Sequence, residues 1–173
     1  MNYIYQDNLQ SSRLITRYLI EDDYKIISKF LADNECSQFF PNPGLSFDDW
    51  GKFWVEKQKA RYIESRFGLQ ALINKDTNEF IGMCGLLLQL ADGVNEVEVG
   101  YHILKQNWGK GYATEAAQLF KNFAFENKIS DNIVSIIHEN NIRSQRVAER
   151  NGMQQEKKIM FWEAPHFVYR IKQ

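Results

Sequence analysis

The chain has 173 residues and a formal net charge of −1, with 44% hydrophobic and 14% aromatic residues. These values are typical of one folded domain over residues 1–173, and they exclude a disordered chain or a broadly basic surface for nucleic acid. The first residues lack the pattern of a signal peptide and no apolar run is long enough to cross a membrane, so we expect a cytoplasmic protein without a membrane partner.

The first half of the chain predicts a strand, two helices and then three strands. Proline and glycine residues separate the two helices, and Ser46 followed by Asp49 gives the second helix a capping-box-like start. The links between the three strands are short and rich in turn residues, so these strands should be antiparallel neighbours. In chain order, the elements are expected at 13–19, 21–32, 46–64, 68–74, 80–90 and 96–104.

The second half predicts a helix, a strand, another helix and two final strands. The first of these helices follows a segment with two glycines, and the second ends at Asn151 and Gly152, a pair typical of a helix C-terminus. The whole order is of the α/β (α+β) type, with one parallel strand pair connected through the helix after the glycines. In chain order, the elements are expected at 111–128, 133–137, 142–150, 154–162 and 166–171.

The segment from Gln106 to Ala116 is the most informative part of the chain. It joins an extended apolar segment to a helix start, where the first N–H groups lack partners in the chain and the helix dipole adds positive charge. Gly109 and Gly111 leave room for the backbone to come close to a phosphate group. The segment therefore predicts a site for a phosphate-bearing cofactor; the alternative is a glycine hairpin beside a surface helix.

Two familiar phosphate-binding loops do not fit this segment. A Walker loop needs a lysine directly after its last glycine, where this chain has Tyr112, and a dinucleotide fingerprint needs a third glycine, where it has Thr114. The pattern that fits, Gln106-x-x-Gly109-x-Gly111, resembles the acetyl-CoA pyrophosphate loop of the GNAT superfamily of N-acetyltransferases. The longer string WGKGYATEA is similar to the RimJ/RimL branch, which acetylates ribosomal-protein N-termini and other amines.

This resemblance extends to the order of elements along nearly the whole chain. It implies a GNAT fold: a mixed, mostly antiparallel sheet of six or seven strands, about four flanking helices, and a central parallel strand pair that splays apart. The pantetheine arm of acetyl-CoA would lie in the gap, paired with the backbone of Tyr101, His102 and Ile103. The N–H groups from Trp108 to Thr114 would bind the pyrophosphate.

The resemblance also implies a second contact region at Asn141, which starts a pattern similar to N-x-x-S-x-x-V-x-x-x-x-G-F of the family. There the asparagine binds the pantetheine arm and caps a helix, and both roles are compatible here. Two side chains of the glycine segment remain open: Lys110 contacts phosphate or is solvated, and Trp108 stacks near the cofactor or only packs. The cofactor contacts that the resemblance implies are Tyr101, His102, Ile103, Gln106, Trp108, Gly109, Lys110, Gly111, Tyr112, Ala113, Thr114, Asn141 and Ser144.

Amine acetylation needs a group that takes a proton from the amine, and a carboxylate is the usual device in the family. Glu98 is the first candidate because it matches the glutamate of the branch pattern E-[IV]-G-Y; Glu96 shares its strand face, and both could merely be solvated. Many members carry a tyrosine acid where this chain has Ala148, which leaves Ser144 as the candidate proton donor or a hydrogen-bond partner of the sulfur.

The remaining candidates have a simpler structural reading. The cysteines Cys36 and Cys84 and the strand histidines His102 and His138 form no pairing or spacing typical of a disulfide or metal site, so no metal is expected. Five aromatic residues either line an acceptor pocket or belong to the core: Trp50, Trp54, Phe161, Trp162 and Tyr169.

Together these features predict an acetyl-CoA-dependent N-acetyltransferase that transfers the acetyl group directly to a primary amine in a ternary complex. The alternative is a GNAT-fold module that binds acyl-CoA without turnover. The sequence leaves the acceptor open among a protein N-terminus, a polyamine, an amino acid and an aminoglycoside, and the protein is expected to be a monomer or a homodimer.

Overall fold

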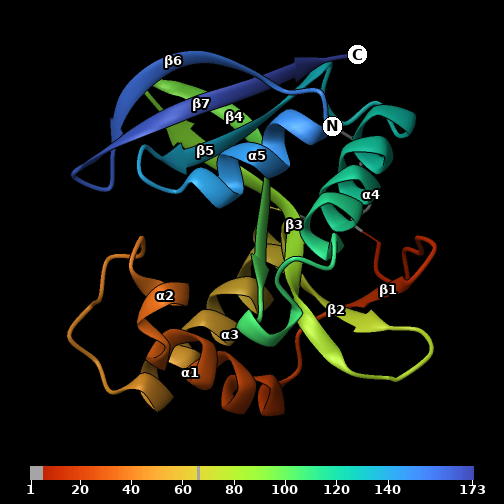
Figure 1. Ribbon diagram of the computed structural model, residues 1–173, viewed down its shortest axis with the longest axis vertical. Coiled ribbons are helices and arrows are strands. Elements are labelled where there is room, and N and C mark those ends of the chain that lie inside the picture. Colours follow the sequence, from red (N-terminus) through yellow and green to blue (C-terminus); the bar gives the residue numbers. More distant parts are fainter. Residues whose placement is uncertain (1–5, 66) are drawn as a thin grey trace.

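The computed structural model describes residues 6–65 and 67–173, and a twisted seven-stranded sheet runs through this part of the chain (Figure 1). The strand order is β1-β2-β3-β4-β5-β7-β6, and every neighbouring pair is antiparallel except β4 and β5. The strands are β1 (Leu14–Arg17), β2 (Gly68–Asn74), β3 (Phe80–Ala91), β4 (Val94–Ile103), β5 (Asn132–His138), β6 (Gln154–Phe161) and β7 (Ala164–Lys172).

Helices cover both faces of the sheet. Side chains of α1 and α3 pack against one face, and side chains of α4 and α5 pack against the other. The helices are α1 (Tyr24–Ala32), α2 (Asn34–Ser37), α3 (Phe47–Glu64), α4 (Tyr112–Glu126) and α5 (Ile142–Arg150), with 3-10 turns η1 (Glu21–Asp23) and η2 (Lys105–Asn107). This is the predicted α/β architecture, with one addition: the short helix α2 was not predicted, because a single turn is too short to show a helical period.

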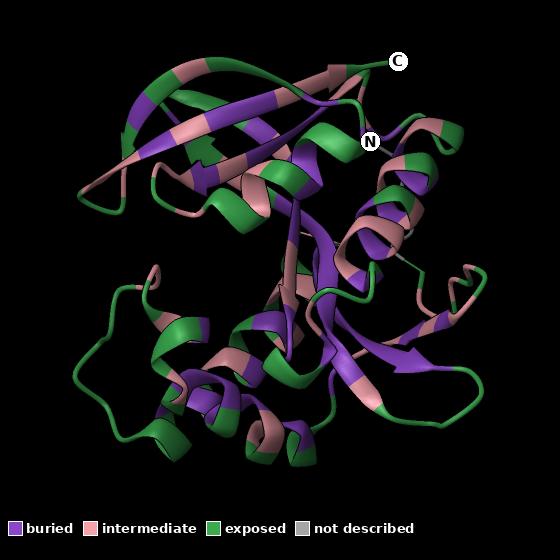
Figure 2. Cartoon of the chain, in the orientation of Figure 1, coloured by how far each residue is buried: buried purple, intermediate pink, exposed green. Residues whose placement is uncertain are grey.

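Among the described residues, the two larger hydrophobic cores lie one on each face and β3 contributes to both, while a smaller cluster lies between β5, β6 and β7 around Val134, Ile159 and Val168. Cys84 and Leu86 of β3 point into the core beneath α4, whereas Met83 and Leu87 point into the core beneath α1 and α3. Successive side chains of a strand alternate between faces, so a strand buried on both sides is apolar at nearly every position. The buried centre of the sheet is visible as a continuous band in Figure 2.

The predicted helix ends are confirmed. The Ser46 hydroxyl accepts a hydrogen bond from the N–H of Asp49 at the start of α3, and the C-terminus of α5 lies at Asn151, followed by Gly152 with φ +80°. No helix in the described ranges has both the length and the apolar character needed to cross a membrane.

The predicted parallel pair splays apart. Only Glu98 and Val134 are in register between β4 and β5, although β4 continues to Ile103. On its other side β5 pairs with β7 along its whole length, which holds β5 away from the end of β4. The two strands are joined instead by a side chain, because the hydroxyl of Ser135 donates to the carbonyl of Val99 at 2.9 Å. The edge of β4 is therefore open from Val99 onward.

Candidate active site

The glycine segment leaves a run of backbone N–H groups without partners. Gly109 and Gly111 have φ of +75° and +82°, a conformation that strains any residue with a side chain, and α4 begins directly after them. Within the described part of the chain, no acceptor pairs with the N–H groups from Gly109 to Thr114. The N–H of Trp108, expected to belong to this run, instead donates to the carbonyl of Lys105 at 3.1 Å.

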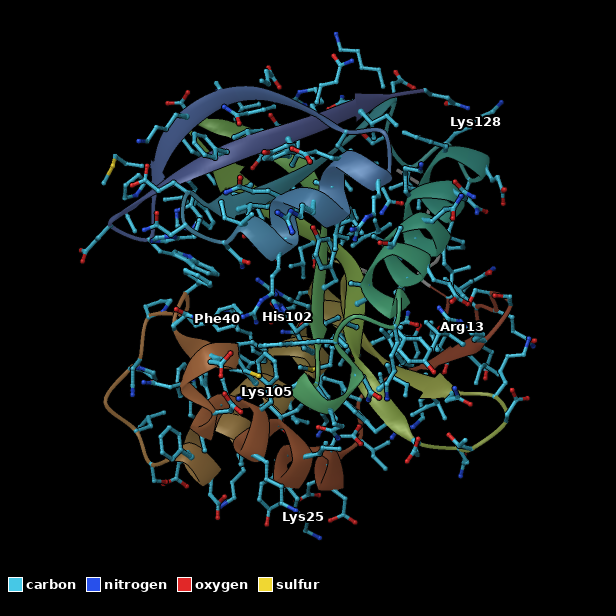
Figure 3. The ribbon with its side chains drawn as sticks, viewed as in Figure 1. Arg13, Lys25, Phe40, His102, Lys105 and Lys128 are labelled. Carbon is cyan, nitrogen blue, oxygen red and sulfur yellow. The ribbon has the colours of Figure 1, made fainter. Side chains whose placement is uncertain are left out.

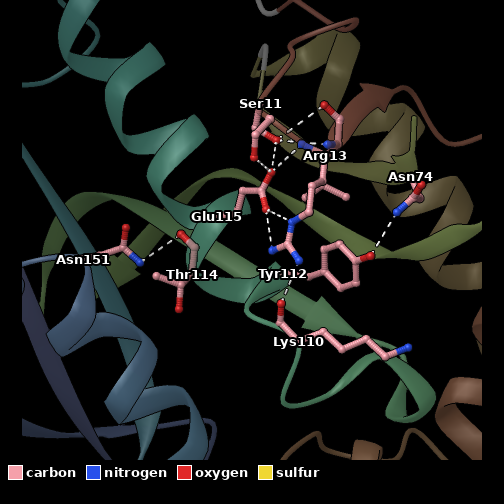
Figure 4. A network of polar contacts seen from close by, with 10 residues as sticks. Ser11, Arg13, Asn74, Lys110, Tyr112, Thr114, Glu115 and Asn151 are labelled. Atoms are coloured by element: carbon pink, nitrogen blue, oxygen red, sulfur yellow. Dashed lines mark hydrogen bonds and ion pairs between the residues drawn. The ribbon is translucent and has the colours of Figure 1, made fainter. Parts of the chain in front are cut away.

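An ion pair behind the segment fixes its orientation (Figure 4). The guanidinium of Arg13 binds the carboxylate of Glu115, with a closest approach of 2.6 Å, and also donates to the carbonyl of Lys110 at 2.9 Å. It lies over the ring of Tyr112, whose hydroxyl accepts from Asn74 at 3.0 Å. Because the carbonyl of Lys110 is bound on this side, the free N–H groups are left for the cavity.

The carboxylate of Glu115 also accepts hydrogen bonds from the hydroxyls of Ser11 and Ser12. Burial alone would raise the pKa of Glu115, but the hydrogen bonds from Ser11 and Arg13 outweigh burial and hold that pKa below its usual value. The anchor behind the segment is therefore ionised at neutral pH.

The open edge of β4 continues from this segment. The carbonyl of Val99 faces the gap, where it meets Ser135, and the carbonyl of Ile103 accepts from the indole N–H of Trp108 at 2.7 Å. Alternate residues of a strand direct their backbone groups to the same edge, so the N–H and C=O of Tyr101 also face the gap. Of the three residues expected to pair with a pantetheine arm, Tyr101 thus has both backbone groups toward the gap.

Across the gap lies the start of α5. The side chain of Asn141 accepts from the N–H of Ser144 at 3.2 Å, so this residue is the expected N-cap. The phenol of Tyr101 donates to the carbonyl of Ser144 at 2.8 Å, and burial raises the pKa of this phenol far above its usual value. The Ser144 hydroxyl itself lines the cavity and has no hydrogen-bond partner in the described ranges.

One cavity of about 1190 Å³ unites these groups. It is bordered by the glycine segment, the open edge of β4, the start of α5 and the segment after α2. Two expected contacts lie outside it: the amine of Lys110 is bound to Asn107 Oδ1 at 3.0 Å, and Gln106 borders a separate cavity beside α1. Lys110 is thus not among the residues that line the cavity, although Asn107, which binds its amine, is; Figure 4 shows the carbonyl of Lys110 bound by Arg13.

Three arginines of α5 border the cavity and were not predicted as site residues: Arg143, Arg146 and Arg150. Arg143 lies 4.2 Å over the ring of Trp108 and 3.4 Å from the carboxylate of Glu35, so it crosses the mouth of the cavity. In the part of the chain that the structure describes, Arg146 and Arg150 have no ion-pair partner. Their spacing of three and four residues places them on one helix face, and this spacing was the available sequence signal.

The two candidate glutamates share a face of β4 but have different surroundings. Glu96 forms a two-pronged ion pair with Arg170, with Oε1–Nη2 at 2.6 Å and Oε2–Nη1 at 2.9 Å. Glu98 is equally buried but has no ion pair among the described residues; it accepts from Gln89 Nε2 at 2.9 Å and from the N–H of Ile136 at 3.2 Å. Burial raises the pKa of Glu98 and outweighs these hydrogen bonds. Glu98, not Glu96, borders the cavity.

The aromatic candidates divide between core and cavity. Trp50 and Tyr169 are core residues, 3% and 2% exposed. Trp54 and Phe161 pack against rings that line the cavity, and Trp162 lines it directly.

The comparisons with known proteins agree with this geometry. The family profile described as "Acetyltransferase (GNAT) domain" matches residues 13–154. The chain belongs to the GNAT acetyltransferases. Two Bacillus subtilis proteins are among its relatives: uncharacterised YkkB is 35% identical over 69% of both chains, and the N-acetyltransferase YoaA is 24% identical over 86% of this chain and 83% of its own.

Solved GNAT structures share the fold. An acetyltransferase from Agrobacterium tumefaciens superposes with a TM-score of 0.81 at 27% identity, covering 99% of this chain and 97% of its own. The ribosomal-protein-S5-alanine acetyltransferase of Vibrio fischeri has a TM-score of 0.73 at 14% identity over 94% of both chains. RimJ of Mycobacterium smegmatis, solved with CoA-disulfide, has a TM-score of 0.73 at 15% identity, covering 92% of this chain and 81% of its own. The predicted GNAT fold and acetyltransferase activity are thereby confirmed.

Proposed function

We propose that this acetyltransferase uses acetyl-CoA as donor and a primary amine as acceptor, with direct transfer in a ternary complex. The observation that carries this proposal is the run of unpaired N–H groups from Gly109 to Thr114, which opens onto the same cavity as the free edge of β4. Six N–H donors at a helix start suit a pyrophosphate. RimJ of M. smegmatis, which has the same fold, binds CoA as its disulfide.

The residues around the cavity fit the rest of this donor. Arg146 and Arg150 supply positive charge beside the helix start, where the further phosphate of CoA needs a partner. The open N–H and C=O groups of Tyr101 can pair with amide groups of the pantetheine arm as a neighbouring strand would. When bound, acetyl-CoA supplies an acetyl thioester whose CoA part leaves as a thiol or thiolate.

Glu98 takes the proton that the acceptor amine must lose. An amine is protonated near neutral pH and is nucleophilic only after it loses that proton. The carboxylate of Glu98 borders the cavity without an ion pair in the described chain, and its raised pKa makes it a stronger base than an exposed glutamate. Glu96 is held by Arg170 and is a structural residue in this proposal.

Ser144 contributes a hydroxyl to the cavity wall next to the start of α5. With its backbone N–H bound to Asn141 and its carbonyl bound to Tyr101, the position of this residue is fixed while its hydroxyl stays available. We assign it a hydrogen bond to the leaving sulfur, because a thiolate departs without a strong acid and a serine hydroxyl is a weak one.

The proposal is tested by measuring thiol release from acetyl-CoA over a panel of primary amines, with mass spectrometry of the products. We expect stoichiometric release of thiol and formation of an N-acetyl product with at least one amine. Tight binding of acetyl-CoA by calorimetry without thiol release for any amine would contradict transfer and favour the binding module. Thiol release that needs no amine would contradict the acceptor assignment.

A further inference from the structure

All three histidines of the chain line the cavity that holds Glu98. His102 lies on β4, His138 ends β5, and His166 lies on β7 directly opposite His138 in the register. Glu98 and His102 are four residues apart on one strand and so share a face of the sheet. Three strands thus bring three imidazoles to one wall, beside the proposed base.

Aromatic rings from other segments complete this wall. Phe39 and Phe40, which follow α2, lie 4.9 Å from the ring of His138 and 5.0 Å from the ring of His102, respectively. Trp162, in the turn between β6 and β7, lies 6.4 Å from the ring of His166. These centroid distances are those of aromatic pairs. Figure 3 shows Phe40 and His102 side by side between the two halves of the molecule.

The turn that carries Trp162 is held in an unusual conformation. Trp162 and Glu163 have φ of +50° and +61°, and a bulky residue rarely adopts positive φ. Trp162 is nevertheless 48% exposed, so burial in a core does not account for its placement. A two-residue turn between paired strands requires positive φ at both of its positions, so the conformation follows from the tight connection of β6 to β7 and leaves the indole against His166 in the cavity lining.

The wall carries little charge. Burial lowers the pKa of His102 to about 4 and also lowers the pKa of His166, so both rings are neutral at physiological pH. Of the three carboxylates that line the cavity, Glu35 is paired with Lys105 and Arg143, and Glu115 is paired with Arg13. Glu98 is therefore the one lining carboxylate in the described chain without an ion pair, although the more distant charge of Arg61 acts on it.

His166 offers one polar group on this wall. Its Nδ1 is 2.9 Å from the carbonyl of Ala164, so Nδ1 carries the proton of the neutral ring and Nε2 is a hydrogen-bond acceptor. Nε2 has no partner in the described ranges. The neighbouring wall is close to the base, because the N–H of Ile136 binds Glu98 and His138 follows two residues later, about 7 Å along the strand.

We propose that the acceptor is a primary amine joined to an aromatic ring through a short aliphatic link, with the ring against His138, His166 and Trp162 and the amine at Glu98. This inference rests on the proposed function. A polyamine would need a second unpaired carboxylate, which the lining lacks in the described chain. A short link suits this arrangement because His138 lies about 7 Å along the strand from Ile136, whose N–H binds Glu98.

The test compares 2-phenylethylamine, n-hexylamine and spermidine as acceptors for the wild-type protein. We expect kcat/KM to be at least about tenfold higher for 2-phenylethylamine than for spermidine, and several-fold higher than for n-hexylamine. In the variant Trp162→Ala this preference should fall about three- to tenfold, mainly through KM, with the affinity for acetyl-CoA unchanged. Phe53→Ala, which removes a ring outside the cavity that is 50% exposed, should leave all three values unchanged.

A binding measurement keeps this inference separate from the proposed function. Addition of 2-phenylethylamine to the protein with CoA should shift the imidazole C–H NMR signals of His138 and His166, whereas spermidine should not. Acetylation of amines without ring preference, or with preference for spermidine, would overturn the inference and leave the proposed function intact. Histidine shifts without any acetylation would overturn the proposed function and leave the ring pocket; no shifts and no acetylation would overturn both.

Discussion

The two ends of the cavity are built in different ways. At the cofactor end, six neighbouring residues present backbone N–H groups, and their positions follow from two glycines and a helix start. At the acceptor end, the wall consists of side chains from four separate segments: β4, β5, the β6–β7 hairpin and the segment after α2. A backbone site depends on conformation and tolerates changes of side chain, whereas a side-chain site changes whenever one of its residues changes. The cofactor end can therefore stay constant while acceptor preference varies.

Substitution of Glu98 should have the largest effect, and it should affect catalysis without affecting the cofactor end of the cavity. Glu98→Gln should lower kcat by about 100- to 10,000-fold while leaving the dissociation constant of acetyl-CoA unchanged, because the amide cannot take the amine proton. In the wild type, activity should fall as the pH drops through the raised pKa of Glu98, and this limb should vanish in the variant. Thiol-release assays at a series of pH values measure kcat and its pH dependence, and calorimetry measures the dissociation constant of acetyl-CoA.

Glu96→Gln is the matched control for that experiment. It disturbs the ion pair with Arg170, so it should lower the free energy of unfolding by about 1–3 kcal/mol and leave the pH profile in place. A loss of activity with Glu96→Gln alone, in a folded protein, would transfer the base to Glu96.

A second test concerns the backbone end alone. Gly111→Trp should weaken acetyl-CoA binding by about 100-fold, because it strains the positive φ and starts a bulky side chain 3.5 Å from the Arg13 guanidinium that orients the segment, so at least two charge-assisted hydrogen bonds from its N–H groups are lost. Gly93→Trp is the control: Gly93 has φ +76° and open space around it, but it lies in the turn between β3 and β4. If both substitutions weaken acetyl-CoA binding equally by calorimetry, the effect of Gly111→Trp comes from backbone strain alone and not from the loss of a binding site at the segment.

A third test asks whether the ring wall is held neutral, as inferred for the acceptor end. The pKa of His102 is about 4 in the folded protein against a usual 6.5, so on acidification the unfolded chain takes up the proton first. Folding stability is therefore lost as the pH falls, by about 1 kcal/mol between about pH 7 and pH 5.5. His102→Phe keeps a ring among Phe40 and Trp54 and should flatten this pH dependence in urea titrations. An unchanged slope would mean that His102 is not kept neutral by the fold.

The smallest expected effect belongs to the arginines of α5. Arg146→Gln and Arg150→Gln should each weaken acetyl-CoA about threefold and reduce the salt dependence of its affinity, because both act through partly screened charge. Arg170→Gln would not serve as a control since it removes the ion pair with the buried Glu96; Lys172→Gln, on an exposed strand end, does. Salt dependence that persists in the double variant would exclude these arginines from the phosphate site.

The sequence predicted most of what is local. The strands, the four longer helices, the glycine segment and the caps at Ser46 and Asn141 all follow from short-range patterns, and the structure agrees. It did not predict that Arg13 would fix the glycine segment, nor that Phe39, His138 and Trp162 would meet. Such groupings depend on strand order and register, which a single sequence does not display.

Glu96 and Glu98 are a second example of what the sequence could not predict. The alternation along β4 placed both on one face, but their difference comes from Arg170 on β7, more than seventy residues away. The ion pair with Arg170 gives Glu96 a structural role and leaves Glu98 as the candidate base.

The bonds between Glu115 and residues 11–13 join parts of the chain that are more than 100 positions apart. During synthesis, residues 11–13 leave the ribosome before Glu115 does, but their contact with it can form only after α4 has emerged. Helix formation takes microseconds, whereas contacts across such a long separation form late. We expect α4 to form before the glycine segment at its start has its final shape, so the affinity for acetyl-CoA proposed for that segment should be acquired late in folding.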